Sequence, residues 1–206
     1  MIIDQWVLTA AHCVVDDVVR VTVELGQHRR NTDSIELIIP LPQVRIHPDY
    51  RNPQMRRSSN DLALLKLDDP VDFNNEPNVR PICLPSNTDE RFAELRATVA
   101  GWGITTAGGR ASDIPLETEV IVISDSRCKE TYGSRITEDM LCTISPRDGP
   151  FFQGFCKGDS GYKTINYPSV SNISPLIGGP LMISDNRLKG SIFCVEPKII
   201  STPNYL

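Results

Sequence analysis

The sequence predicts an all-β fold, either an antiparallel barrel or a sandwich. Residues 19–25 read V-R-V-T-V-E-L and alternate strictly between apolar and polar side chains, which puts one face of a strand on a core and the other in water. Similar short runs follow along the chain, separated by turn formers such as His47-Pro48-Asp49 and Gly108-Gly109. No long stretch repeats its apolar residues with the period of a helix, so strands are expected to dominate.

Six strands and one helix are expected. The strands are predicted at residues 19–25, 35–39, 44–47, 62–67, 97–102 and 119–123. The helix is predicted from Ser124 to about Tyr132. Ser124 or Asp125 can cap its start, and Gly133 can close its end.

The composition argues against several classes of protein. A chain of 206 residues with 40% hydrophobic content can bury one substantial core, so a single domain is expected. The formal net charge of -5 and the scattered basic residues argue against a nucleic-acid partner and against binding to an anionic membrane. No apolar run approaches the length that spans a bilayer. The start lacks the pattern of a signal peptide, an observation of little weight if the N-terminus is truncated.

The cysteines indicate disulfides rather than a metal centre. None of them forms a C-x-x-C pair, and the three histidines lack metal-ligand spacing. We therefore expect disulfides formed in an oxidising compartment, with no metal site and no cofactor. The six cysteines are Cys13, Cys83, Cys128, Cys142, Cys156 and Cys194.

Three short segments carry the chemistry of the chain. W-V-L-T-A-A-H-C ends with His12 and Cys13, N-D-L-A-L-L-K-L begins with Asn60 and Asp61, and C-K-G-D-S-G contains Ser160. Together with G-W-G at residues 101–103, R-P-I-C-L-P at 80–85 and His47-Pro48, these segments resemble the chymotrypsin-like (trypsin-like) serine protease family. The resemblance covers about residues 1–161 and 179–183.

This resemblance implies a double six-stranded β-barrel, in a single partial peptidase domain spanning residues 1–206. The first barrel is expected at about residues 1–96 and the second at about 97–206, with an insertion at 162–178. The second barrel is expected to be incomplete.

The expected chemistry is nucleophilic catalysis by a serine. A serine hydroxyl is a poor nucleophile at neutral pH, so Ser160 needs a base within hydrogen-bond reach, and the imidazole of His12 suits that role. The base needs a buried carboxylate on its other nitrogen, for which Asp61 is the candidate. The backbone N–H groups of Gly158 and Ser160 are expected to form the oxyanion hole. Singly, a histidine in an apolar strand or an Asn-Asp turn is usually structural, and it is the combination that indicates catalysis.

The resemblance implies roles for three residues near the nucleophile. Asp159 is expected to pair with the N-terminal amine that activation cleavage releases. Gly154 stands at the floor of the primary specificity pocket, where family members that select Arg or Lys carry a carboxylate. Phe155 is expected to fill part of this pocket, which favours small or medium apolar groups in the substrate.

The resemblance also implies a pattern of cysteine pairs. Cys128 and Cys142 are expected to form a disulfide that closes a short loop. Cys194 is considered as the partner of Cys156 only because the usual partner of Cys156 is missing from this sequence. Cys83 stands where multi-domain members bridge to a light or regulatory chain.

The chain departs from the family pattern in three places. It begins late in the strand that precedes His12, and residues 184–206 show neither the Ser-Trp-Gly segment nor the C-terminal helix. Seventeen residues, Tyr162 to Gly178, separate G-D-S-G from its usual continuation, and their deletion restores C-K-G-D-S-G-G-P-L-M. Our hypothesis is that this segment, and the tail after about Asn186, are translated from non-coding sequence.

The predicted function of the intact gene product is that of a secreted, extracellular serine endopeptidase in a proteolytic cascade, acting on a protein or peptide substrate. The alternative is a non-catalytic protease homologue that serves as a binding or regulatory scaffold. A third interpretation, a fragment without activity, applies to this chain as written, which is expected to fold poorly and to be inactive. No nucleic-acid or membrane partner is expected.

Overall fold

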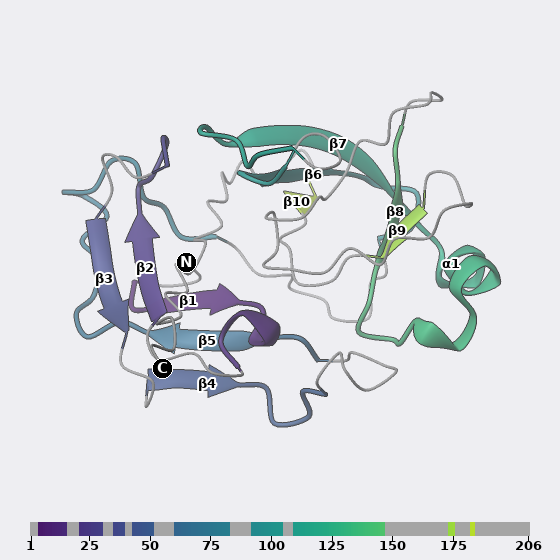
Figure 1. Ribbon diagram of the computed structural model, residues 1–206, viewed down its shortest axis with the longest axis horizontal. Coiled ribbons are helices and arrows are strands. Elements are labelled where there is room, and N and C mark those ends of the chain that lie inside the picture. The colour runs from purple at the N-terminus through teal and green to yellow at the C-terminus, as the bar shows by residue number, and fades with distance from the viewer. Residues whose placement is uncertain are drawn as a thin grey trace, which may run out of the picture.

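The computed structural model describes residues 4–15, 21–30, 35–39, 43–51, 60–82, 92–104, 109–146, 173–175 and 182–183. The described strands fall into two groups, one on the left and lower side of Figure 1 and the other on its upper and right side. The first group contains β1 (Trp6–Thr9), β2 (Val21–Leu25), β3 (Ile35–Ile39), β4 (Val44–Ile46) and β5 (Ala63–Lys66). The second contains β6 (Arg96–Gly101), β7 (Leu116–Ile123), β8 (Cys142–Ile144), β9 (Ile173–Pro175) and β10 (Met182–Ile183).

The first group forms two antiparallel sheets around one core. β5 lies between β1 and β4, and β2 pairs with β3. Val7 of β1 pairs with Leu65 of β5, and both side chains point into the core, where each is 1% exposed. Val21, Val23 and Leu25 of β2 join the same cluster, as the strict alternation of this segment predicts.

The second group forms one antiparallel sheet in the order β10-β6-β7-β8-β9. Ala97 and Val99 of β6 pack with Val120 and Val122 of β7, which makes a small core between the two longest strands of this sheet. Alternate residues of β6 are buried, as the period of two predicts, whereas in β7 the buried residues are confined to its second half.

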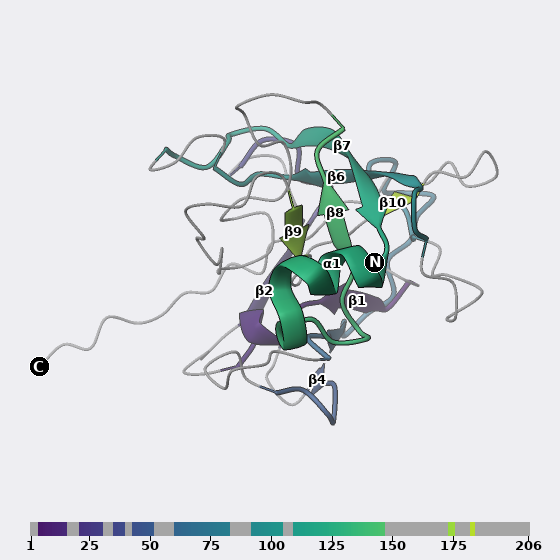
Figure 2. The same ribbon diagram turned by 90° about the vertical axis from the view of Figure 1, so that its right-hand side faces the viewer.

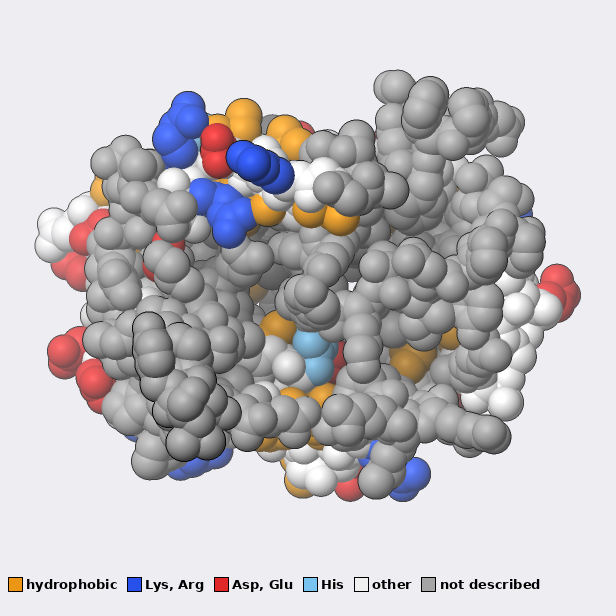
Figure 3. All heavy atoms as spheres, viewed as in Figure 1, with side chains coloured by type: hydrophobic (Ala, Val, Ile, Leu, Met, Phe, Trp, Pro, Cys, Tyr) orange, Lys and Arg blue, Asp and Glu red, His pale blue; other side chains and the backbone are white. Residues whose placement is uncertain are grey.

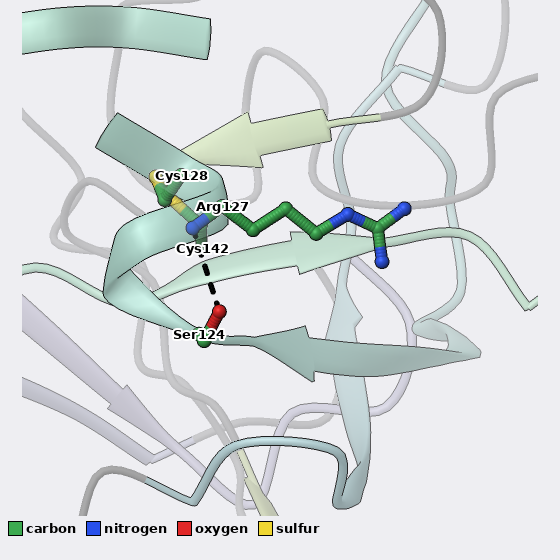
Figure 4. The surroundings of a disulfide bond; sticks show 4 residues. All are labelled: Ser124, Arg127, Cys128 and Cys142. Atoms are coloured by element: carbon green, nitrogen blue, oxygen red, sulfur yellow. Dashed lines mark hydrogen bonds between the residues drawn. A yellow bond between two sulfur atoms is a disulfide. The ribbon is translucent and has the colours of Figure 1, made fainter. Parts of the chain in front are cut away.

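Helix α1 (Asp125–Tyr132) follows β7 directly and lies beside β8 (Figure 2). The Ser124 side chain accepts a hydrogen bond from the backbone N–H of Arg127, and Gly133 ends the helix with a φ of 61° (Figure 4). A disulfide joins Cys128 of the helix to Cys142 of β8, as the resemblance implies (Figure 4). The predicted helix, its cap and this pairing are thus present in the structure.

The all-β prediction is confirmed, with differences in detail. The described strands form three open sheets, and no closed barrel is seen within the described ranges. β7 begins at Leu116, three residues before the prediction, and β4 ends one residue earlier than expected. The strand that precedes His12 is β1, which ends at Thr9, and His12 itself lies in the 3₁₀ turn η1 (Ala11–Cys13).

Part of the segment interpreted as an insertion belongs to the second sheet. β9 pairs with β8 through Ile144 and Ile173, Thr143 and Ser174, and Cys142 and Pro175. β10, from the continuation after the insertion, pairs with β6. The second sheet therefore uses residues from both sides of Gly179.

Within the described ranges, three long-range hydrogen bonds join the two groups of strands. The indole N–H of Trp102 donates to the carbonyl oxygen of His28 at 3.3 Å. The backbone N–H of Arg30 donates to the carbonyl oxygen of Asp113 at 2.9 Å. The backbone N–H of Asn60 donates to a carboxylate oxygen of Asp139 at 2.6 Å. The last of these bonds lies next to Asp61 and is considered again below.

Among the described helices, none has the length and apolar character that crossing a bilayer requires. Within the same part of the chain, no cluster of three or more histidine, cysteine or acidic side chains is placed to hold a metal ion.

Candidate active site

His12 enters the site from a short turn whose flanking residues are buried. β1 ends at Thr9, and the chain turns through Ala10 and Ala11, which are 3% and 0% exposed. Backbone hydrogen bonds from Cys13 to Ala10 and from Val14 to Ala11 close the turn. Small side chains at these two positions let the turn lie against the core, which directs the histidine away from it.

Asp61 faces His12 with both of its carboxylate oxygens. Oδ2 lies 2.5 Å from Nδ1 of the His12 ring, and Oδ1 accepts a hydrogen bond from the backbone N–H of His12 at 2.9 Å. The two side chains are 10% and 11% exposed. This double contact fixes the orientation of the ring and places the shared proton on Nδ1, so Nε2 is the nitrogen that can accept a further proton.

The electrostatics of the pair favour a charged histidine. Burial disfavours the charged ring, but hydrogen bonds to the Asp61 carboxylate and the Cys13 thiol outweigh this effect and raise the pKa of His12 above its ordinary value of 6.5. A raised pKa makes the imidazole a stronger base. It also makes the imidazolium–carboxylate ion pair the favoured state below that pKa.

Asp61 owes its position to the head of β5. Asn60 before it adopts a left-handed φ of 53°, a conformation that asparagine tolerates better than most residues. The carbonyl oxygen of Asn60 accepts a hydrogen bond from the N–H of Leu62 at 2.8 Å, which makes a tight turn around Asp61. The chain then enters the buried strand, so Asp61 is held at the rim of the first core.

On the face drawn in Figure 3, histidine atoms lie near the centre with acidic atoms beside them and apolar side chains around them. The basic side chains visible on this face lie toward its margins.

The structure brings together two of the predicted site residues, His12 and Asp61. Apart from Cys128 and Cys142, whose disulfide is described above, the remaining predicted site residues lie outside the described ranges, so their expected roles stay predictions. These residues are Cys83, Gly154, Phe155, Cys156, Gly158, Asp159, Ser160 and Cys194. Cys13 is a buried free thiol in the described structure.

The sequence interpretation missed Asp139, which contacts the residue before Asp61. Asp139 lies 79 residues from Asn60 in the sequence. The residues around Asp139 look like an ordinary acidic turn, so the local sequence gives no sign of the contact. Only the fold brings the two segments together.

A sequence model of the family described as trypsin matches residues 1–162. The chain belongs to the trypsin family of serine endopeptidases. The predicted family is thereby confirmed.

Curated relatives support the same assignment. The chain is 34% identical over 159 residues to granzyme M of Homo sapiens, an alignment that covers 76% of this chain and 58% of the relative. It is 33% identical over 163 residues to serine protease 1 of Rattus norvegicus, covering 78% and 61%. It is 32% identical over 181 residues to phenoloxidase-activating factor 1 of Holotrichia diomphalia, covering 78% and 47%. The chain thus spans about half to three fifths of the length of these relatives.

Among solved structures, the chain resembles neuropsin, described as a serine protease expressed in the limbic system of mouse brain. The TM-score is 0.67 at 26% identity, and the match covers 89% of this chain and 70% of that chain. The likeness confirms that the described sheets belong to a chymotrypsin-like fold.

Proposed function

We propose that the protein carrying this chain is a serine endopeptidase with His12, Asp61 and Ser160 as its catalytic triad. The observation that carries the proposal is the double contact between Asp61 and His12, through the ring nitrogen and the backbone N–H. This geometry orients the ring so that Nε2 faces away from the carboxylate, as a general base for a hydroxyl requires.

The proposed mechanism is acyl transfer. The hydroxyl oxygen of Ser160 attacks the carbonyl carbon of a peptide bond while Nε2 of His12 takes the hydroxyl proton. The N–H groups of Gly158 and Ser160 stabilise the negative charge on the carbonyl oxygen. His12 then gives its proton to the leaving amine, and a water molecule, deprotonated by the same ring, releases the acyl group from Ser160.

We place this activity outside the cell, with a protein or peptide as substrate. The cysteines fit an oxidising compartment, and one relative is named as a phenoloxidase-activating factor, which fits a role in a proteolytic cascade. Asp159 is the proposed partner of the activated N-terminus, Gly154 and Phe155 the proposed pocket floor, and Cys83 the proposed bridge to a light or regulatory chain. We divide the domain into a first barrel at about residues 1–96 and a second at 97–206.

One observation favours the second candidate, a non-catalytic homologue that acts as a scaffold. Seventeen residues separate G-D-S-G from G-P-L-M, and three of them, Ile173–Pro175, pair with β8 as an ordinary part of the sheet. With this segment paired in the sheet, G-D-S-G stays separated from its usual continuation, which favours a homologue without catalysis. Sequencing the mature message across residues 156–182 tests the hypothesis of a non-coding insertion, which repeated recovery of all seventeen codons would contradict.

A fluorophosphonate probe separates the two functions, because it modifies only an activated serine. We expect the full-length, activated protein to be labelled and the Ser160→Ala variant to remain unlabelled, with the 206-residue chain itself unlabelled. A correctly folded, activated protein that takes no label favours the scaffold. Labelling that persists in Ser160→Ala excludes Ser160 as the nucleophile.

A further inference from the structure

We propose that Asp139 is a positioning residue, which ties the second group of strands to the His12–Asp61 pair. Its carboxylate oxygen Oδ2 accepts a hydrogen bond of 2.6 Å from the backbone N–H of Asn60, the residue immediately before Asp61. The inference rests on the proposed function, since it concerns the geometry of the same site.

The first group of strands holds Asn60 by its carbonyl oxygen and its side chain. The carbonyl oxygen accepts from the N–H of Leu62 at 2.8 Å, and the side-chain amide donates to the carbonyl oxygen of Asp49 at 3.3 Å. The remaining main-chain group, the N–H, points to Asp139. Both main-chain groups and the side-chain NH₂ of Asn60 therefore have a partner, and the second group of strands supplies one of them.

The turn around Asp61 is also fixed at its far end. The carbonyl oxygen of Leu62 accepts a hydrogen bond from the N–H of His47 at 2.9 Å. Asp61 thus lies between two anchored residues, and its backbone has little freedom to rotate. Loss of the Asp139 contact frees the N-terminal anchor, where the chain is in the left-handed conformation.

Asp139 itself is exposed, but the turn that carries it is anchored. Ile136 and Met140, three residues before it and one after, are 7% and 8% exposed and pack in the core beneath α1. The N–H of Met140 donates to the carbonyl oxygen of Thr137, and Cys142 is tied to Cys128. The anchored turn holds the Asp139 carboxylate in place beside Asn60. A hydrogen bond to an ionised carboxylate is about twice as strong as one between neutral groups.

The contact matters because the proposed triad draws on both groups of strands. His12 and Asp61 come from the first group, whereas Ser160 lies in the sequence between β8 and β9 of the second. Shifts of about 1 Å between reacting groups reduce rates by as much as about 100-fold. A hydrogen bond between the second group and the residue next to Asp61 sets their relative position at the point where this precision is needed.

The test compares Asp139→Ala with Asp139→Asn in the full-length protein. The amide oxygen of asparagine keeps an acceptor for the Asn60 N–H but lacks the charge, so the pair of variants separates positioning from electrostatics. Relative to Asp139→Asn, we expect Asp139→Ala to lower the pKa of His12, followed by NMR, by about one unit. We also expect kcat to fall roughly tenfold while KM changes less than about twofold. Glu138→Gln, which removes a charge on the adjacent residue, should leave both quantities unchanged.

Equal His12 titrations in the alanine and asparagine variants would overturn the inference, because Asp139 would then act through its charge alone. The titration is also measurable in the Ser160→Ala background. Absence of fluorophosphonate labelling therefore counts against the proposed function, while an unaltered titration counts against the positioning role.

A second measurement needs no variant. The Asn60 amide should exchange with deuterium more slowly than an unprotected amide in the unmodified protein, because its N–H is held by Asp139. Exchange at the rate of an unstructured peptide would overturn the inference, even if Asp139→Ala failed to fold.

Discussion

The two groups of strands differ in how they hold their parts together. In the described residues, the first group has one continuous core, built from β1, β2, β5 and the turn beside His12. The second has two smaller clusters, one between β6 and β7 and the other beneath α1. The second group adds a capped helix and a disulfide to this packing. The His12–Asp61 pair thus rests on a single core, with Asp139 as its proposed contact from the second group, whereas a helix cap and a disulfide support the half that carries the proposed nucleophile.

The largest expected effect concerns catalysis by the His12–Asp61 pair, which the first group of strands carries. Asp61→Asn should lower the kcat of the activated protein about 10⁴-fold, the loss known for the equivalent change in this family. An amide cannot stabilise the imidazolium of His12 as the carboxylate does. Steady-state kinetics measures the loss, and a circular dichroism melt serves as the control for folding. A reduction smaller than tenfold would contradict the proposed role of Asp61.

Removal of a core side chain tests whether the first group acts as one unit. Leu65→Ala should lower the free energy of unfolding by about 4 kcal/mol, because it leaves a cavity in the centre of the core. The matched control is Leu116→Ala on β7, which is 43% exposed and should change stability by less than about 0.5 kcal/mol. Urea denaturation compares the two variants, and similar losses in both would show that the first core is not dominant.

Loss of the disulfide tests the second group separately. The double change Cys128→Ser and Cys142→Ser should lower stability by about 3 kcal/mol, because the bond closes a loop with a sequence separation of 14 residues. The NMR titration of His12 should shift in the same direction as in Asp139→Ala, because the disulfide anchors the turn that carries Asp139. A displaced His12 titration would show that the two groups are coupled more tightly than their separate cores imply.

The pH dependence of stability and of kcat tests the role of the ion pair between His12 and Asp61. Since the pKa of His12 is raised in the folded state, its contribution to stability is complete below about pH 6.5 and is lost as the pH rises through the raised value. Across this interval, stability should fall by at most about 1.4 kcal/mol per pH unit. The kcat should rise over the same interval, because only the neutral ring accepts a proton. His12→Gln should flatten the stability profile, and a profile unaffected by this change would contradict the assignment.

The smallest expected effect concerns the helix cap. Ser124→Ala should lower stability by about 1 kcal/mol, because the backbone N–H of Arg127 loses its acceptor. Ser124→Asp, which retains an acceptor, should restore most of the loss. Thermal melts of the three proteins measure the difference, and equal destabilisation by both changes would exclude a capping role.

Burial patterns made the central strands predictable from the sequence. β2, β3 and β5 were predicted because they alternate or carry short apolar runs. The start of β7 was missed because Leu116 and Glu117 are both exposed and show no alternation, and their strand conformation depends on pairing with β6. β8 was missed because three residues are too short to form a pattern.

The site was predictable only in part. Sequence motifs identified His12 and Asp61, whose contact is now described, because side-chain chemistry ties them to specific neighbours along the chain. The turn at His12 gave no separate signal in the sequence, because W-V-L-T-A-A-H-C reads as one apolar run and the end of β1 is set by tertiary packing. The contact of Asp139 could not be predicted from the sequence, because its partner Asn60 lies 79 residues away.

The short outer strands of the second sheet have a consequence for association between molecules. β10 and β9 lie at its two edges, with only two and three residues, and Pro175 at the end of β9 has no N–H to donate. An edge strand this short offers few backbone groups to another chain, and a proline removes one donor. The pairing of β9 with β8 thus leaves a short strand that ends in proline at this edge of the second sheet, which is a poor template for intermolecular strand addition.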